Sequence, residues 1–326
     1  MNKEQNDLIN RILENIPKEI KPAPYLADML DISLESAYRR FGGKIPFTFE
    51  EVTKLSQLLN FSVDDIIDRK MTNSKALFEL KADELVGSSK AFAAMLKRQL
   101  NYIKKLLDSS NSEVLIAMRH LTALSILDFD YLFKFFYYKW TRQTEDASFN
   151  YFFSDVVFPL EIERLLEEIR SLSDAALKNN EQTIISNPSL CLSIVKEIQY
   201  YSKRNLINDE DLQLLKNDLF DWLASTDQLI KTGINPQGGR CNYFLSSFDI
   251  IESNSICTTF DMRMESQFWI YTINPLIVSN SGACKMHKEW FNSLKRYSTY
   301  ITQSNEILQA EFLDKQREYI NTINNL

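Results

Sequence analysis

Residues 26–41, with the sequence LADMLDISLESAYRRF, decide the fold of the N-terminal region. Leu26 and Leu30 place one apolar face on a short helix, because residues four positions apart lie on the same side of a helix. Asp31 follows where the chain must turn, and aspartate tolerates the left-handed backbone conformation better than most residues. Ser33 is a favourable N-cap residue for the next helix. The stretch therefore predicts a helix, a tight turn and a second helix.

The second helix, expected over residues 34–41, carries arginines on its solvent side. Ala37 and Phe41 face inward at helical spacing. The side chains left largely to solvent are Glu35, Ser36, Tyr38, Arg39 and Arg40. A protein that reads the major groove of DNA needs a helix of this kind, which follows a tight turn, is capped and presents arginines.

In this arrangement the chain resembles the Cro and lambda-repressor-like helix-turn-helix family, the XRE type, over about residues 5–68. The resemblance rests on L-A-x-x-L-x-I-S at 26–33, on the arginine-bearing helix, and on the Gly43-Lys44 pair that precedes Pro46. It implies a five-helix N-terminal domain that binds double-stranded DNA with sequence specificity, through the helix at 34–41.

The resemblance also implies roles for single residues. The base-reading candidates are Leu34, Glu35 and Arg39, and the candidates nearer the phosphates are Ser33, Ser36, Tyr38 and Lys44. Arg40 falls where many members of the family bury an apolar residue, so the choice between Arg39 and Arg40 stays open. An arginine that grips guanine O6 and N7 with two hydrogen bonds contributes about 1–3 kcal/mol of discrimination.

Composition argues against the commonest nucleotide-binding enzymes. The 326 residues include only seven glycines, and no G-x-G-x-x-G or G-x-x-x-x-G-K motif can be drawn through them. Two histidines leave little material for imidazole-based catalysis. The net charge is −7, and residues 1–70 hold ten basic and twelve acidic side chains, so any DNA contact must come from a local patch. We therefore expect neither an enzyme nor a cofactor.

Most of the remaining chain predicts helices. Thr48 and Glu51 form a capping box, and Ser62 is a second helix-opening residue. Residues 69–75, RKMTNSK, are polar and aperiodic, and predict a linker between a DNA-binding domain at 1–68 and a regulatory and dimerisation domain at 76–326. Apolar periodicity predicts long helices over 84–108, 112–140, 154–178, 189–204 and 208–231.

The period changes after the run GINPQGG at 233–239. Three segments rich in Phe, Ile, Tyr and Thr predict strands: 242–251, 255–262 and 267–274. A helical tail resumes near Ala283. The expected fold class is therefore mainly α: a five-helix lambda-repressor-like domain, then a large helical domain with a small antiparallel β-meander at about 242–274.

Two features of the C-terminal region suggest ligands. Cys284 and His287 lie at i and i+3 of a predicted helix, which a metal ion can bridge, and Cys241 and Cys257 lie near the expected strands. Because no C-x-x-C pair is present and buried free cysteines are common, we expect no metal here. Aromatic residues of the strands could wall an effector pocket: Tyr243, Phe244, Phe248, Phe260, Phe268, Trp269 and Tyr271.

The sequence supports three hypotheses of function. The first is a DNA-binding transcriptional regulator that acts as a homodimer and answers to a small-molecule or protein effector. The second is an adaptor whose helical C-terminal body binds another protein. The third is an enzyme in that body, dependent on a metal held by Cys284 and His287. Four scattered cysteines, no visible secretory leader and no convincing membrane span favour the cytoplasm.

Overall fold

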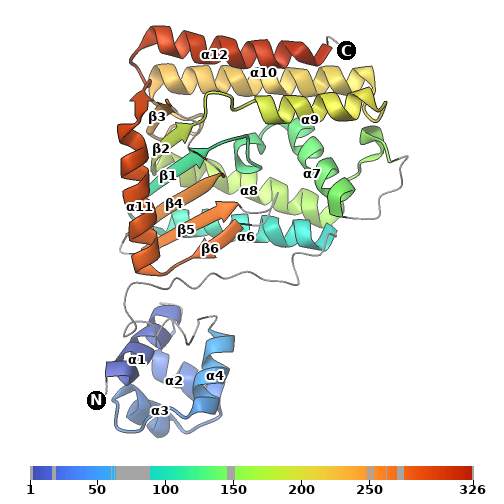
Figure 1. Ribbon diagram of the computed structural model, residues 1–326. Coiled ribbons are helices and arrows are strands. Elements are labelled where there is room, and N and C mark those ends of the chain that lie inside the picture. The colour runs from blue at the N-terminus through green and yellow to red at the C-terminus, as the bar shows by residue number, and fades with distance from the viewer. Residues whose placement is uncertain are drawn as a thin grey trace. The chain divides into compact units, whose positions relative to one another are not determined.

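The computed structural model describes residues 3–16, 20–59, 61, 63, 89–144, 151–247, 251, 253–261, 263–269 and 275–324. The chain divides into two compact units, Met1–Leu77 and Phe78–Leu326 (Figure 1). The linker expected at residues 69–75 lies outside the described residues. Within the described ranges, no helix combines the length and the hydropathy of a membrane span.

The described part of the N-terminal unit is helical. Its helices are α1 (Lys3–Asn15), α2 (Pro22–Leu30), α3 (Leu34–Phe41) and α4 (Phe49–Leu58). Each helix contributes a fully buried apolar side chain to a common core, and these are Ile12, Leu26, Ala37 and Leu55. The fifth helix expected after Ser62 falls, apart from Val63, on residues outside the described ranges.

The second unit is built on a seven-stranded mixed sheet with the order β6-β5-β4-β1-β2-β3-β7. The strands are β1 (Ser112–Met118), β2 (Glu181–Ser186), β3 (Cys241–Ser246), β4 (Ser255–Phe260), β5 (Arg263–Trp269), β6 (Pro275–Val278) and β7 (Ser298–Tyr300). Strands β1, β2 and β3 are parallel neighbours. Beyond β1 the sheet continues as the antiparallel strands β4, β5 and β6, and β7 runs antiparallel beside β3.

The mainly α fold class expected from the sequence is wrong, because the central strand β1 lies inside the segment 112–140 that was expected to be one helix. Its sequence SEVLIAM is a short continuous apolar run, which periodicity cannot distinguish from a buried helix. The run is continuous because both faces of β1 are covered. Val114 belongs to the apolar cluster on one face, and Leu115 and Ala117 belong to the cluster on the other.

The expected meander is also corrected. The segment predicted as its first strand, 242–251, supplies β3, which is separated from β4 in the sheet by β1 and β2. The observed meander is β4-β5-β6, and residues 270–274 of the third predicted strand lie outside the described residues. Strand β3 joins β2 in parallel, a pairing that needs a crossover connection rather than a tight turn.

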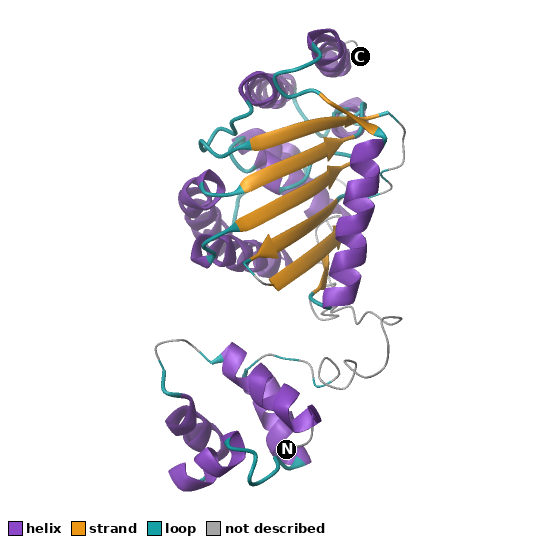
Figure 2. Cartoon of the chain, turned by 90° about the vertical axis from the view of Figure 1, so that its left-hand side faces the viewer, coloured by secondary structure: helices purple, strands orange, loops and turns teal. Residues whose placement is uncertain are grey.

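Helices cover both faces of the sheet. Helices α6 (Ser89–Asp108) and α8 (Leu160–Lys178) pack together and share an apolar cluster with Val114 and Ile256. Helix α11 (Ser281–Arg296) crosses the strands on the opposite face, where Phe291 and Leu294 meet Leu115 (Figure 2). The remaining helices are η2 (Leu124–Ile126), α7 (Asp130–Thr144), η3 (Phe153–Asp155), α9 (Leu192–Lys203), α10 (Asp209–Thr232), α12 (Glu306–Asn321) and η4 (Thr322–Asn324).

The packing of α11 on the sheet predicts a contrast between two of its residues. Phe291 is fully buried, whereas Met286 is 68% exposed. We expect Phe291→Ala to lower the free energy of unfolding of the second unit by about 3–5 kcal/mol, because it removes a buried ring and leaves a cavity. The control Met286→Ala is expected to change it by less than about 0.5 kcal/mol.

Urea unfolding followed by tryptophan fluorescence measures this difference. All four tryptophans belong to the second unit, so the signal reports on that unit alone. Equal destabilisation by the two substitutions would contradict the placement of α11 on the sheet.

Candidate nucleic-acid interface

The turn between α2 and α3 has the geometry expected from its sequence. Asp31 adopts the left-handed conformation, with φ 55° and ψ 49°, and its amide donates to the Ala27 carbonyl. The Ile32 amide donates to the same carbonyl at 3.0 Å. Helix α3 then begins after Ser33, whose Oγ accepts a hydrogen bond from the Ser36 amide at 3.2 Å. The predicted turn at Asp31 and the predicted N-cap at Ser33 are both confirmed.

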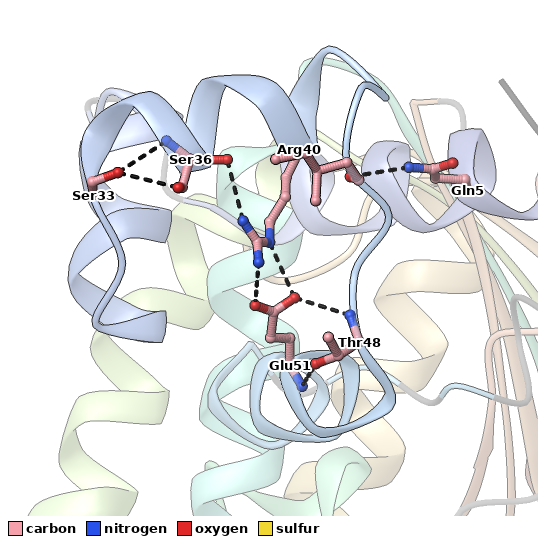
Figure 3. Close-up of polar contacts among 7 residues, drawn as sticks. Gln5, Ser33, Ser36, Arg40, Thr48 and Glu51 are labelled. Atoms are coloured by element: carbon pink, nitrogen blue, oxygen red, sulfur yellow. Dashed lines mark hydrogen bonds and ion pairs between the residues drawn. The ribbon is translucent and has the colours of Figure 1, made fainter.

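Arg40 extends from α3 towards α4 and not into solvent (Figure 3). Its Nη2 donates to Glu51 Oε1 at 2.6 Å, and its Nε donates to Glu51 Oε2 at 3.1 Å. The two side chains are only 12% and 16% exposed. A two-point pair of this kind holds a defined geometry as well as a charge. Arg40 therefore joins two helices of the unit.

Glu51 has a second role at the start of α4. Its Oε2 accepts a hydrogen bond from the Thr48 amide at 2.9 Å, while its own amide donates to Thr48 Oγ1 at 3.2 Å, so the predicted capping box is confirmed. Partial burial by itself raises the pKa of the Glu51 carboxyl. The hydrogen bonds from Arg40 and from the Thr48 amide outweigh this effect, so the pKa lies below its ordinary value of 4.5.

The solvent face of α3 carries the other candidate residues. Leu34 is 47% exposed and Tyr38 is 59% exposed. Glu35 and Arg39 are also exposed, and with Leu34 and Tyr38 they follow the spacing of one helix face. Arg39 makes no side-chain hydrogen bond or ion pair to another described residue, although its carbonyl accepts the Lys44 amide at 2.8 Å.

The eight candidate residues separate into two groups by exposure. Ser36 and Arg40 are half-buried, and the six exposed residues, on α3 or in the turns beside it, are Ser33, Leu34, Glu35, Tyr38, Arg39 and Lys44. The backbone of Ser36 serves the N-cap and accepts Arg40 Nη1 at 3.5 Å. The sequence identified Glu51 only as a capping residue. The pairing of Glu51 with Arg40 did leave a signal in the sequence. Arg40 follows the buried Ala37 by three residues and so lies on the same side of the helix, where a charged side chain needs a partner.

The metal candidates Cys284 and His287 are engaged within the second unit. The ring nitrogens of His287 lie 2.9 Å from Ser266 Oγ and 3.2 Å from Ser255 Oγ. The Cys284 thiol donates to the Val278 carbonyl at 3.3 Å. Burial lowers the pKa of His287 to about 4, which keeps the ring neutral. Among the residues that the structure describes, no group of three His, Cys, Asp or Glu side chains could hold a metal ion.

The aromatic side chains that could have walled one pocket are divided between the faces of the sheet. Tyr243 packs near Phe312 of α12, whereas its neighbour Phe244 belongs to the cluster beneath α11. Trp269 and Phe260 lie in the cluster with α6. Successive strand residues point to opposite faces, so Tyr243 and Phe244 cannot line the same pocket, and the rings do not form one wall. Phe248 and Tyr271 lie outside the described residues.

Comparison with known proteins supports a regulatory role for the N-terminal region. A family model described as BetR domain, a domain associated with transcription regulators, matches residues 7–127. The match includes the whole of α2, α3 and α4 and continues through β1 of the second unit. No curated protein and no solved structure matches the chain.

The pair of Arg40 and Glu51 predicts a local loss of stability in the variant Glu51→Gln. Glutamine can still cap α4, but it removes the charge that Arg40 needs. We expect the free energy of unfolding of the N-terminal unit to fall by about 1.5–3 kcal/mol, the contribution typical of a hydrogen bond to a charged group. Hydrogen exchange of peptides covering residues 34–58, read by mass spectrometry, measures this loss. The neighbouring exposed Glu50, changed to Gln, is the control, and equal effects would contradict the role of the pair.

The lowered pKa of Glu51 predicts a pH dependence. Because the folded-state pKa lies below the unfolded-state value, the carboxylate stabilises the unit above about pH 4.5, and this contribution is lost as the pH falls through the folded pKa. A carbon-13 NMR titration of the glutamate carboxyls should give Glu51 a midpoint below 4.5. In Arg40→Met the midpoint should rise, and an unchanged midpoint would contradict the assignment.

Proposed function

We propose that the protein is a sequence-specific DNA-binding transcriptional regulator of the XRE helix-turn-helix type. The main support for the proposal is the exposed face of α3, a helix that directly follows a left-handed turn at Asp31 and a serine N-cap. A helix in this position can enter the major groove of DNA. The match of residues 7–127 to a domain associated with transcription regulators supports the same conclusion.

The proposal gives each exposed residue of α3 a physical task. Arg39 offers two donors to guanine O6 and N7, Glu35 can accept from cytosine N4, and Leu34 can contact a thymine methyl group. Ser33, Tyr38 and Lys44 then lie nearer the phosphates, which position the helix without reading sequence. Arg40, held by Glu51, sets the orientation of α3 relative to α4.

The proposal extends to the assembly of the protein. Helix-turn-helix proteins of this kind bind paired half-sites about one turn of DNA apart, so we assign the regulator a homodimeric form. The second unit then acts as the regulatory and dimerisation body, and the protein works in the cytoplasm by binding and not by catalysis.

Gel-shift titration at fixed salt, with the upstream DNA of the protein's own gene and a scrambled duplex, tests this function. We expect Arg39→Ala to weaken binding to the specific duplex by about 1–3 kcal/mol, or roughly 5-fold to 150-fold, and to leave scrambled DNA nearly unaffected. Lys44→Ala should weaken both duplexes alike, because a phosphate contact carries no sequence information.

Lys54→Ala provides the matched control, since Lys54 is an exposed basic residue on α4 outside the face of α3. Weak and equal binding to both duplexes by the parent protein and by all three variants would overturn the proposal. A stable protein partner without DNA binding would favour the adaptor function.

A further inference from the structure

A cavity of about 360 Å³, open to solvent on one side, lies between α7 and α9 in the second unit. Its lining consists of Lys139 from α7 and of Ser193, Lys196, Glu197, Tyr200 and Tyr201 from α9. The α9 residues follow the spacing of one helix face, so the cavity runs along a polar stripe of that helix. Ser193, Lys196 and Tyr200 are exposed, so a ligand can reach the cavity from solvent.

The charge around this cavity is positive, although the whole chain is acidic. Lys139 is buried and pairs with Glu197, with 2.5 Å between Nζ and Oε2. Lys196 is exposed and has no ion-pair partner among the described residues. Glu197 therefore neutralises only part of the local charge.

Each tyrosine of the cavity makes a cation–π contact with an arginine of the chain. The Arg142 guanidinium lies 5.9 Å from the centre of the Tyr201 ring, and that of Arg204 lies 5.3 Å from the centre of the Tyr200 ring. Arg204 Nη1 also donates to Tyr200 Oη at 2.9 Å. Aromatic faces attract cations, and a cation of the chain already lies near each of these two rings. These arginines and Lys196 would repel a cationic ligand. An anion would be attracted, because Lys196 has no ion-pair partner among the described residues.

We propose that this cavity binds a small organic anion, an apolar or aromatic body that carries a carboxylate or a phosphate. Lys196 and the hydroxyl of Ser193 hold the charged group, while the buried Lys139 stays paired with Glu197 beside them. The rings of Tyr200 and Tyr201 contact the body of the ligand. This site does not depend on the DNA-binding function, because it is built entirely within the second unit.

Isothermal titration calorimetry of the full chain with benzoate, phenyl phosphate and inorganic phosphate tests the site. We expect saturable binding of benzoate or phenyl phosphate, and the tighter of the two identifies the charged group. Lys196→Glu should weaken that binding by roughly tenfold or more, because it removes a charge-assisted hydrogen bond. Lys203→Glu makes the same change of charge at an exposed position of α9 outside the lining, and should weaken binding less than about twofold.

Three results would overturn the proposal. One is the absence of saturable binding by benzoate and phenyl phosphate at millimolar concentration. Another is an equal loss in Lys196→Glu and Lys203→Glu, which would indicate a general effect of charge. The third is inorganic phosphate binding as tightly as phenyl phosphate, since the tyrosine wall would then contribute nothing. Circular dichroism of both variants verifies that they fold.

Discussion

The second unit depends on the burial of β1 on every side. Its backbone pairs with β2 along one edge and with β4 along the other, so that Ala117 lies opposite both Ile185 and Ser255. Its two faces lie against apolar clusters shared with α6 and α8 on one side and with α11 on the other. A strand in this position cannot leave a polar backbone group unpaired, because no water reaches it. The parallel neighbour β2 and the antiparallel neighbour β4 together supply this pairing.

The N-terminal unit has a comparable centre in the carboxylate of Glu51. One side chain accepts both Arg40 donors and the Thr48 amide, so it starts α4 and holds α3 in place. The same arrangement determines which arginine is available for the proposed contact with DNA. With Arg40 held inside the unit, Arg39 is the arginine of α3 that remains exposed. A rigid support beneath a recognition helix keeps its reading face in one orientation, which sequence discrimination requires.

Local features of the fold could be predicted well from the sequence. The left-handed turn at Asp31, the N-cap at Ser33 and the capping box of Thr48 and Glu51 depend on residues within a few positions of each other. Long amphipathic helices such as α10 also carry their own signal. By contrast, β1 and β2 are short and buried, and their pattern reflects neighbours that lie far along the chain. The same holds for the cavity residues, since α9 and the distant Lys139 meet only in the folded unit.

The turn at Asp31 and the helix starts at Ser33 and Thr48 follow from the local sequence, because capping and turn formation depend on side chains that bond to nearby backbone. Which arginine of α3 is exposed depends on tertiary contacts, because the carboxylate that holds Arg40 lies eleven residues away along the chain. Tertiary contacts also select a strand for the apolar run at 112–118. A continuous apolar run suits a helix or a buried strand equally, and the pairing partners that select the strand are brought to it by the fold.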